Sequence, residues 1–94
     1  MTQDKMNEIK IGAIKWRIVE VASSEIDCDE YSAGDQSEQT QTIRIDKSLS
    51  PEMKQVVLIH EILHCINGQL DHNIVEMLAL NLHQVLTENK WILK

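Results

Sequence analysis

Residues 56–64 of this 94-residue chain read VVLIHEILH, an apolar run that carries two histidines four positions apart. The flanking residues indicate that the run lies inside a helix. Ser50 offers a capping hydroxyl, Pro51 suits the first helical position, and the pair Asn67-Gly68 is a typical helix end. We therefore predict one helix that starts at Ser50-Pro51 and stops at Asn67-Gly68, with the rest of the fold arranged around it.

A second helix is expected after the first. Apolar residues form one stripe at helical spacing between Asp71 and about Thr87. The members of that stripe are Ile74, Leu78, Leu82 and Val85. Asp71 and Asn73 are candidates for its N-terminal cap. The tail that follows contains Trp91 and Ile92, which we expect to cover an end of the core.

The segment before the motif helix follows a different pattern. From Glu8 to Asp46 the apolar residues tend to alternate with polar ones, which is typical of half-buried strands. Gly12-Ala13 predicts a turn between the first two strands. Gly34-Asp35 predicts a hairpin turn between a weak strand near Cys28–Ala33 and a better one at Thr40–Asp46.

These patterns predict an α+β fold. We expect a small N-terminal antiparallel sheet of about three or four strands, packed on two C-terminal helices. The chain is short enough to form a single domain over residues 1–94. In the motif helix, Val57 and Met53 lie near His60 and His64. The residues roughly opposite the two histidines are Leu58, Ile62 and Ile66. We therefore expect the helix to pack on the rest of the protein by the face that carries Leu58 and Ile62, and to expose its histidines on another face.

Composition excludes several classes of function. The net charge is −6 and the basic residues form no run, which argues against nucleic acid and anionic membranes as partners. No apolar stretch has the length of a membrane span, and the N-terminus does not resemble a signal peptide. Two cysteines, Cys28 and Cys65, are too few for a disulfide framework. We expect a cytoplasmic protein with reduced thiols.

The sequence His60-Glu61-Ile62-Leu63-His64 is an HExxH motif. Residues four apart lie on one side of a helix, so both imidazoles can bind a single ion. Glu61 is rotated by about 100° from His60 and can reach a water molecule bound to that ion. Zinc lowers the pKa of such a water toward about 7, and the carboxylate takes its proton. The motif thus predicts a Zn²⁺ site for hydrolysis; the alternative is two histidines on a solvated face.

A catalytic zinc needs a third protein ligand as well as an open position. The HExxHxxGxxH class is excluded because this chain has Asn67 and Leu70 where that pattern requires Gly and His. Glu76 is the preferred candidate, because Ala79 three residues later would let the two helices approach closely. His72, at the start of the second helix, is the other candidate.

The run from Thr42 to Asn89 resembles the small zinc metallopeptidases of the ImmA/IrrE type, which phages and other mobile elements often encode. The resemblance is carried by TIRID at 42–46, LIHEILH at 58–64 and the Glu-x-x-Ala pattern at 76–79. It implies a zincin-like (gluzincin-like) fold, with His60, His64 and Glu76 as zinc ligands. It also implies that Glu61 is the catalytic carboxylate. Some members act on repressor proteins of the element that encodes them.

The motif and the resemblance together predict a zinc-dependent metallopeptidase, an endopeptidase with Glu61 as general base. Its partner would be a protein or peptide substrate, with a repressor or other regulatory protein as one candidate. The alternative is a metal-stabilised protein-binding or regulatory module of a phage or mobile element, without efficient protease activity. The sequence does not indicate an oligomeric state.

Four further expectations concern the surroundings of the motif. The strand Thr42–Asp46 lies either at the cleft edge of the sheet, where an extended substrate can pair with it, or in the sheet interior. His83 is expected to be a surface histidine, with a role beside the site as the alternative. Tyr31 is the only phenol available to stabilise a reaction intermediate. Cys65 is expected to be a small buried apolar residue.

Overall fold

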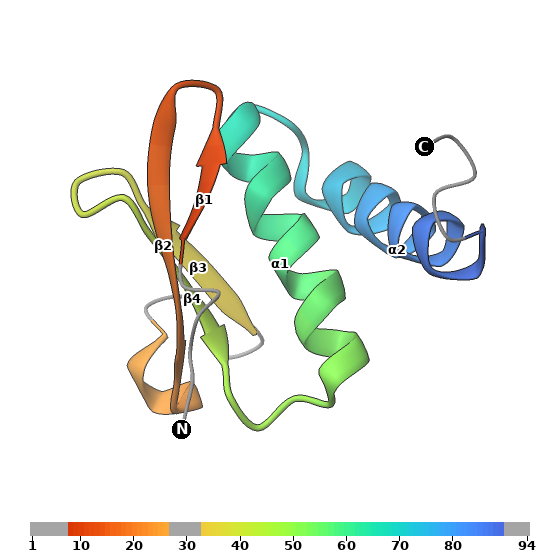
Figure 1. Cartoon of the computed structure of the whole chain (residues 1–94), viewed down its shortest axis with the longest axis horizontal. Coiled ribbons are helices and arrows are strands. Elements are labelled where there is room, and N and C mark those ends of the chain that lie inside the picture. Colours follow the sequence, from red (N-terminus) through yellow and green to blue (C-terminus); the bar gives the residue numbers. More distant parts are fainter. Residues whose placement is uncertain (1–7, 27–32, 90–94) are drawn as a thin grey trace.

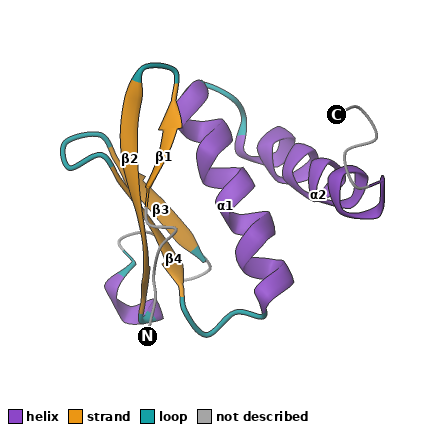
Figure 2. Cartoon of the chain, viewed as in Figure 1, coloured by secondary structure: helices purple, strands orange, loops and turns teal. Residues whose placement is uncertain are grey.

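The computed structural model describes residues 8–26 and 33–89, which form an α+β fold with an N-terminal sheet and two C-terminal helices (Figures 1 and 2). This arrangement of sheet and helices was predicted. The elements in chain order are β1 (Glu8–Ile11), β2 (Ile14–Val21), a short 3-10 helix η1 (Ser23–Glu25), β3 (Gly34–Ser37), β4 (Thr42–Asp46), α1 (Pro51–Ile66) and α2 (His72–Asn89).

The sheet is mixed, with the strand order β1-β2-β4-β3. Two antiparallel pairs, β1 with β2 and β3 with β4, are joined by parallel pairing of β2 with β4, in which Arg17 lies opposite Thr42. The prediction of a purely antiparallel sheet was therefore wrong. Side chains alternate between the two faces in parallel and antiparallel strands alike, so the sequence pattern did not distinguish them. The strand Thr42–Asp46 is an interior strand, and β3 is the edge strand beside it.

The first predicted turn is confirmed and the second was misplaced. Gly12-Ala13 connects β1 to β2, and Gly12 has a φ of 64°, a conformation that favours glycine. Gly34 and Asp35, by contrast, lie within β3, and the β3–β4 turn falls at residues 38–41, where Gln41 has a φ of 52°. That turn contains no glycine, proline or asparagine, so its residues did not indicate a turn. The expected strand near Cys28–Ala33 falls mostly outside the described residues.

Gly34 serves the packing of α1 on the sheet. A Cβ atom at this position would lie 2.7 Å from Val57 Cγ1 and 2.9 Å from the carbonyl oxygen of Arg44. Such distances are shorter than van der Waals contact, so the absence of a side chain is what lets α1 approach β3 and β4 closely. The glycine that resembled a turn signal is therefore a contact point between helix and strand.

The core lies between α1 and the sheet. Its buried members are Trp16, Ile43, Ile45 and Val57. Leu58 and Ile62 of α1 pack against this cluster, as predicted from the helical wheel. The same wheel was wrong for Ile66, which is 63% exposed, and it placed Val57 beside the histidines rather than in the core. Ile43 has no solvent exposure at all, and burial of an isoleucine side chain contributes about 1.5–3 kcal/mol.

α1 lies between the sheet and α2 (Figure 1). Val75 and Ala79 of α2 are completely buried. Three residues of the stripe predicted for this helix, Ile74, Leu82 and Val85, are instead exposed. The buried residues Val75 and Ala79 come one position after the stripe residues Ile74 and Leu78. α2 therefore packs by smaller side chains than the stripe predicted. None of the helices in the described part of the chain is long and apolar enough to cross a membrane.

Capping interactions account for the helix boundaries, which agree with the prediction. The Ser50 hydroxyl accepts a hydrogen bond from the Met53 backbone N–H at 3.2 Å, and the Asn67 N–H donates to the Leu63 carbonyl at 3.0 Å. At the start of α2, the Asp71 carboxylate accepts from the Asn73 N–H at 3.2 Å. These bonds satisfy backbone groups that would otherwise lack partners at helix ends.

Candidate metal centre

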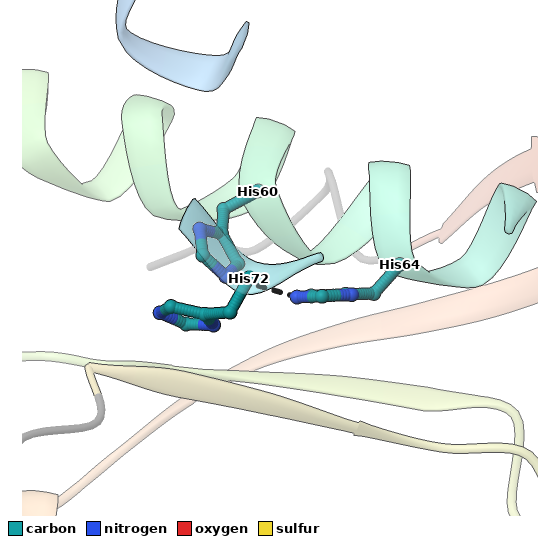
Figure 3. Close-up of side chains that lie close together, drawn as sticks. All are labelled: His60, His64 and His72. Carbon is teal, nitrogen blue, oxygen red and sulfur yellow. Dashed lines mark hydrogen bonds between the residues drawn. The ribbon is translucent and has the colours of Figure 1, made fainter. Parts of the chain in front are cut away.

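His60 and His64 lie on successive turns of α1 and point to the same side of it (Figure 3). Their Nε2 atoms are 3.1 Å apart. Two nitrogens bound to one tetrahedral zinc at about 2.0–2.1 Å are separated by about 3.3 Å. The pair is thus spaced close to what a shared zinc ion requires.

His72, the first residue of α2, joins this pair. Its ring centroid lies 4.7 Å from that of His60 and 5.9 Å from that of His64. One ring nitrogen from each of the three histidines can be chosen so that all lie within 4.8 Å of one another. We call His60, His64 and His72 the histidine cluster; Figure 3 shows its three rings gathered beside α1. The cluster has the number and kind of donors that a zinc ion takes from a protein.

The connection between the helices brings His72 to this position. Within it, the Gln69 N–H donates to the Asn67 side-chain oxygen at 3.0 Å, and the Leu70 N–H donates to the Asn67 carbonyl at 3.2 Å. The Asp71 carbonyl accepts from the Val75 N–H at 3.0 Å. These bonds turn the chain directly after α1, so α2 starts next to the last histidine of the motif.

Glu76 lies one turn after His72, at the margin of the cluster. Its Oε1 atom is 3.4 Å from His60 Nδ1 and 3.8 Å from His72 Nε2, and its side chain is 57% exposed. Ala79, whose small size was expected to let the helices approach, is completely buried. The carboxylate therefore lies near the cluster and approaches His60 at the ring nitrogen that faces away from His64.

Burial and neighbouring charges lower the pKa of two histidines of the cluster. For His60, burial is the main cause, followed by the charges of His64 and His72, while Glu76 partly opposes the shift. For His64, burial again comes first and His72 second. A lowered pKa favours the neutral imidazole, which is the form that binds metals. The expectation that the motif helix would expose its histidines was wrong for His60, which is 9% exposed because residues of α2 lie against it.

Glu61 is directed toward the sheet. Its Oε2 atom lies 3.4 Å from the position of a Cβ atom at Gly34, and the residue is 6% exposed. Burial, with a smaller contribution from the negative charge of Asp35, raises the pKa of Glu61 to about 7. The proposed general base thus lies between α1 and the edge strand β3, in surroundings that favour proton uptake.

An ion pair between β3 and β4 was not predicted from the sequence. Asp35 and Arg44 lie opposite each other in the register, and the Arg44 guanidinium donates to both Asp35 carboxylate oxygens at 2.9 and 2.6 Å. The strand alternation does place Arg44 on the sheet face opposite Ile43 and Ile45. The pairing of Arg44 with Asp35 was not predicted, because Asp35 was expected to lie in a turn.

The remaining candidates lie away from the cluster or outside the described residues. His83 Nε2 is 2.7 Å from Gln55 Oε1, so this histidine connects α2 to an earlier turn of α1. Cys65 packs against the core, and burial, followed by the charges of Glu61 and Glu38, raises its thiol pKa to about 11. Tyr31, Cys28, Trp91 and Ile92 fall outside the described residues.

Comparisons of the chain with family models, curated proteins and solved structures found no match. Its function is therefore inferred from the side chains and their arrangement.

Proposed function

We propose that this chain is a zinc-dependent metallopeptidase whose ion is held by His60, His64 and a third donor from the first two turns of α2. The observation that carries the proposal is the 3.1 Å separation of the His60 and His64 Nε2 atoms on the helix that also carries Glu61. Two imidazoles at that spacing, with a carboxylate on the next residue, are an arrangement that zinc-dependent peptidases use.

Each residue has a defined task in this proposal. Zinc, when bound, supplies a Lewis acid that activates water and polarises a substrate carbonyl. His60 and His64, whose Nε2 atoms face each other, would hold it. Glu61 accepts the proton of the attacking water at its carboxylate and delivers it to the departing amine. The sequence predicts Glu76 as the third donor. Its carboxylate lies 3.4 Å from His60 and 3.8 Å from His72, so this assignment stays a prediction to be tested.

The substrate is proposed to be an extended segment of a protein or peptide. β3 is one of the two edge strands of the described sheet, and the Glu61 carboxyl lies against its first residue, Gly34. Edge strands bind extended peptides by main-chain hydrogen bonds. A peptide added there would pass beside the proposed general base. The resemblance to ImmA/IrrE-type peptidases makes a repressor or other regulatory protein a reasonable first substrate to test.

The exposed side of α2 favours a second candidate, a metal-stabilised protein-binding module. Large apolar side chains are exposed along this helix: Ile74, Met77, Leu80, Leu82 and Val85. Apolar side chains gathered on a small domain are typical of a binding surface. In this candidate the ion would fix α2 against α1, and the protein would act by binding rather than by cleavage.

The test uses the full chain loaded with zinc and a mixture of unstructured protein substrates. Glu61→Gln should abolish cleavage while zinc content stays at one ion per chain. Glu52→Gln is the matched control, because Glu52 is an exposed glutamate in the first turn of the same helix. Full cleavage by the Glu61→Gln protein would refute the general-base assignment. Stoichiometric zinc with no cleavage of any substrate would favour the binding module.

A further inference from the structure

The geometry points to His72 as the third zinc ligand, with Glu76 positioning His60 rather than binding the ion. This inference rests on the proposed zinc centre and specifies its ligands. It differs from the assignment made from sequence, in which Glu76 binds zinc. A ligand set of three histidines leaves one of the four positions around zinc open for water.

The spacing of the ring nitrogens supports His72. One nitrogen from each of His60, His64 and His72 lies within 4.8 Å of the others. Ligand nitrogens on tetrahedral zinc are about 3.3 Å apart, so modest side-chain rotations suffice to close the site. His72 is 70% exposed on its side chain, which leaves it room to rotate.

The contact between Glu76 and His60 supports the second part of the inference, that Glu76 positions His60. His60 Nε2 faces His64 Nε2, whereas His60 Nδ1 faces Glu76 Oε1 at 3.4 Å. When one imidazole nitrogen binds a metal, the other carries a proton and donates it to a nearby carboxylate or carbonyl. Glu76 lies where that acceptor is needed. A carboxylate that holds the far side of the His60 ring fixes its orientation and stabilises its proton.

The backbone around His72 supports a fixed position for this ligand. The Asp71 carboxylate accepts a hydrogen bond from the Asn73 N–H, and the Asp71 backbone carbonyl accepts one from the Val75 N–H. The residue before His72 is therefore held by both its side chain and its backbone. Val75, three residues after His72, has no solvent exposure. The start of α2 is therefore held firmly enough to present a ligand.

The first experiment uses the unmodified, zinc-loaded full chain. X-ray absorption at the zinc edge counts imidazole ligands, and ¹⁵N NMR of the histidine rings shows which nitrogens bind metal. We expect three imidazoles, with His60 bound through Nε2 and protonated at Nδ1. Two imidazoles with a carboxylate would overturn the inference. Because no residue is changed, this measurement does not depend on whether any variant folds.

The second experiment measures zinc affinity by competition with a chelating dye. His72→Ala should weaken binding by more than about 100-fold, beyond the range for residues that only orient a ligand. Glu76→Ala should weaken it by about 10- to 100-fold, in the range of partners that orient a ligand. Glu76→Gln should retain most of the affinity that Glu76→Ala loses, because the amide oxygen still accepts a hydrogen bond from His60 Nδ1–H but is a poor zinc ligand. Gln84→Ala, at an exposed position of the same helix where the side chain bonds Glu88 of α2, is the control and should bind zinc like the unmodified chain.

The outcomes separate the inference from the proposal beneath it. If the unmodified chain binds no zinc, the proposed function fails together with the inference. If it binds zinc, and Glu76→Gln loses affinity while His72→Ala keeps it, Glu76 is the ligand and only the inference is wrong.

Discussion

The Oε2 atom of Glu61 lies 3.4 Å from the point where a side chain at Gly34 would begin. This close approach joins the proposed general base of α1 to the edge strand of the sheet. Val57, one turn earlier, comes even closer to the same point, at 2.7 Å. The position of the Glu61 carboxyl therefore depends on how tightly α1 packs on β3.

Gly34→Ala should destabilise the protein by about 1–3 kcal/mol, the usual cost of overpacking a core. The added methyl group meets the Arg44 carbonyl at 2.9 Å, which is backbone and can move only with the strand. Urea unfolding would measure the loss. Gly68→Ala is the control, because its Cβ would have an ordinary contact at 3.7 Å with the His64 carbonyl. Equal stability of the two variants would contradict the close packing.

The ion pair between Asp35 and Arg44 should contribute to stability, because Asp35 is 9% exposed. Arg44→Met should cost about 1–3 kcal/mol, less than for a fully buried pair because the Arg44 side chain is 31% exposed. The double variant with Asp35→Asn should lose less than the sum of the two single changes. A double-mutant cycle by thermal unfolding measures this coupling. Additive losses would show that the two side chains do not interact.

Asp46 should make stability depend on pH in the acidic range. Its carboxylate accepts hydrogen bonds from the Ser48 N–H and hydroxyl at 2.9 and 2.7 Å, and these bonds lower its pKa below the usual 3.8. Because the folded pKa lies below the unfolded one, the carboxylate stabilises the fold above the unfolded value. That contribution is lost as the pH falls through the folded pKa.

The comparison with Asp46→Asn tests this direction. The unmodified protein should be more stable than the variant at neutral pH, and the difference should shrink below about pH 4. Urea unfolding at several pH values gives the two curves. A difference that grows on acidification would show that the pKa shift has the opposite sign.

The parts of the fold that the sequence predicted correctly depend on local interactions. Caps and helical periodicity placed both ends of α1, and spacing within one helix paired His60 with His64. The helical wheel relates residues of a single helix only, so it did not predict how close His72 of α2 comes to the motif. That proximity depends on how α2 packs, which is set by Val75 and Ala79 rather than by the larger residues of the predicted stripe.

The errors in the sheet have a related cause. Gly34 has the composition of a turn residue, yet it is required by contact with Val57, which lies 23 positions later in the sequence. Because the predicted turn included Asp35, no strand partner was predicted for this residue. Parallel pairing of β2 with β4 also depends on distant segments. Each of these features is determined by tertiary packing, which periodicity and turn signals do not describe.

Ala79→Leu should disturb the metal centre from outside it. Ala79 is completely buried, and a larger side chain there should push α2 away and cost about 1–3 kcal/mol. Because His72 and Glu76 belong to the same helix, zinc affinity should fall as well. Leu80→Ala, at an exposed neighbouring position, should leave both properties nearly unchanged. Thermal unfolding and dye competition measure the two effects, and unaltered zinc binding by Ala79→Leu would contradict the dependence on helix packing.

Zinc should stabilise the folded chain, because the histidine cluster is assembled from two helices and does not exist in the unfolded state. A ligand at 100 times its dissociation constant adds about 2.7 kcal/mol to the free energy of unfolding. For a domain of this size that corresponds to a rise in Tm of about 10–20 °C. Scanning calorimetry with added zinc, and again with a chelator, measures the difference. His60→Ala should remove the zinc-dependent rise, whereas Glu61→Gln should retain it because Glu61 is proposed to act on water and not on the ion. A rise that survives His60→Ala would place the zinc elsewhere in the chain.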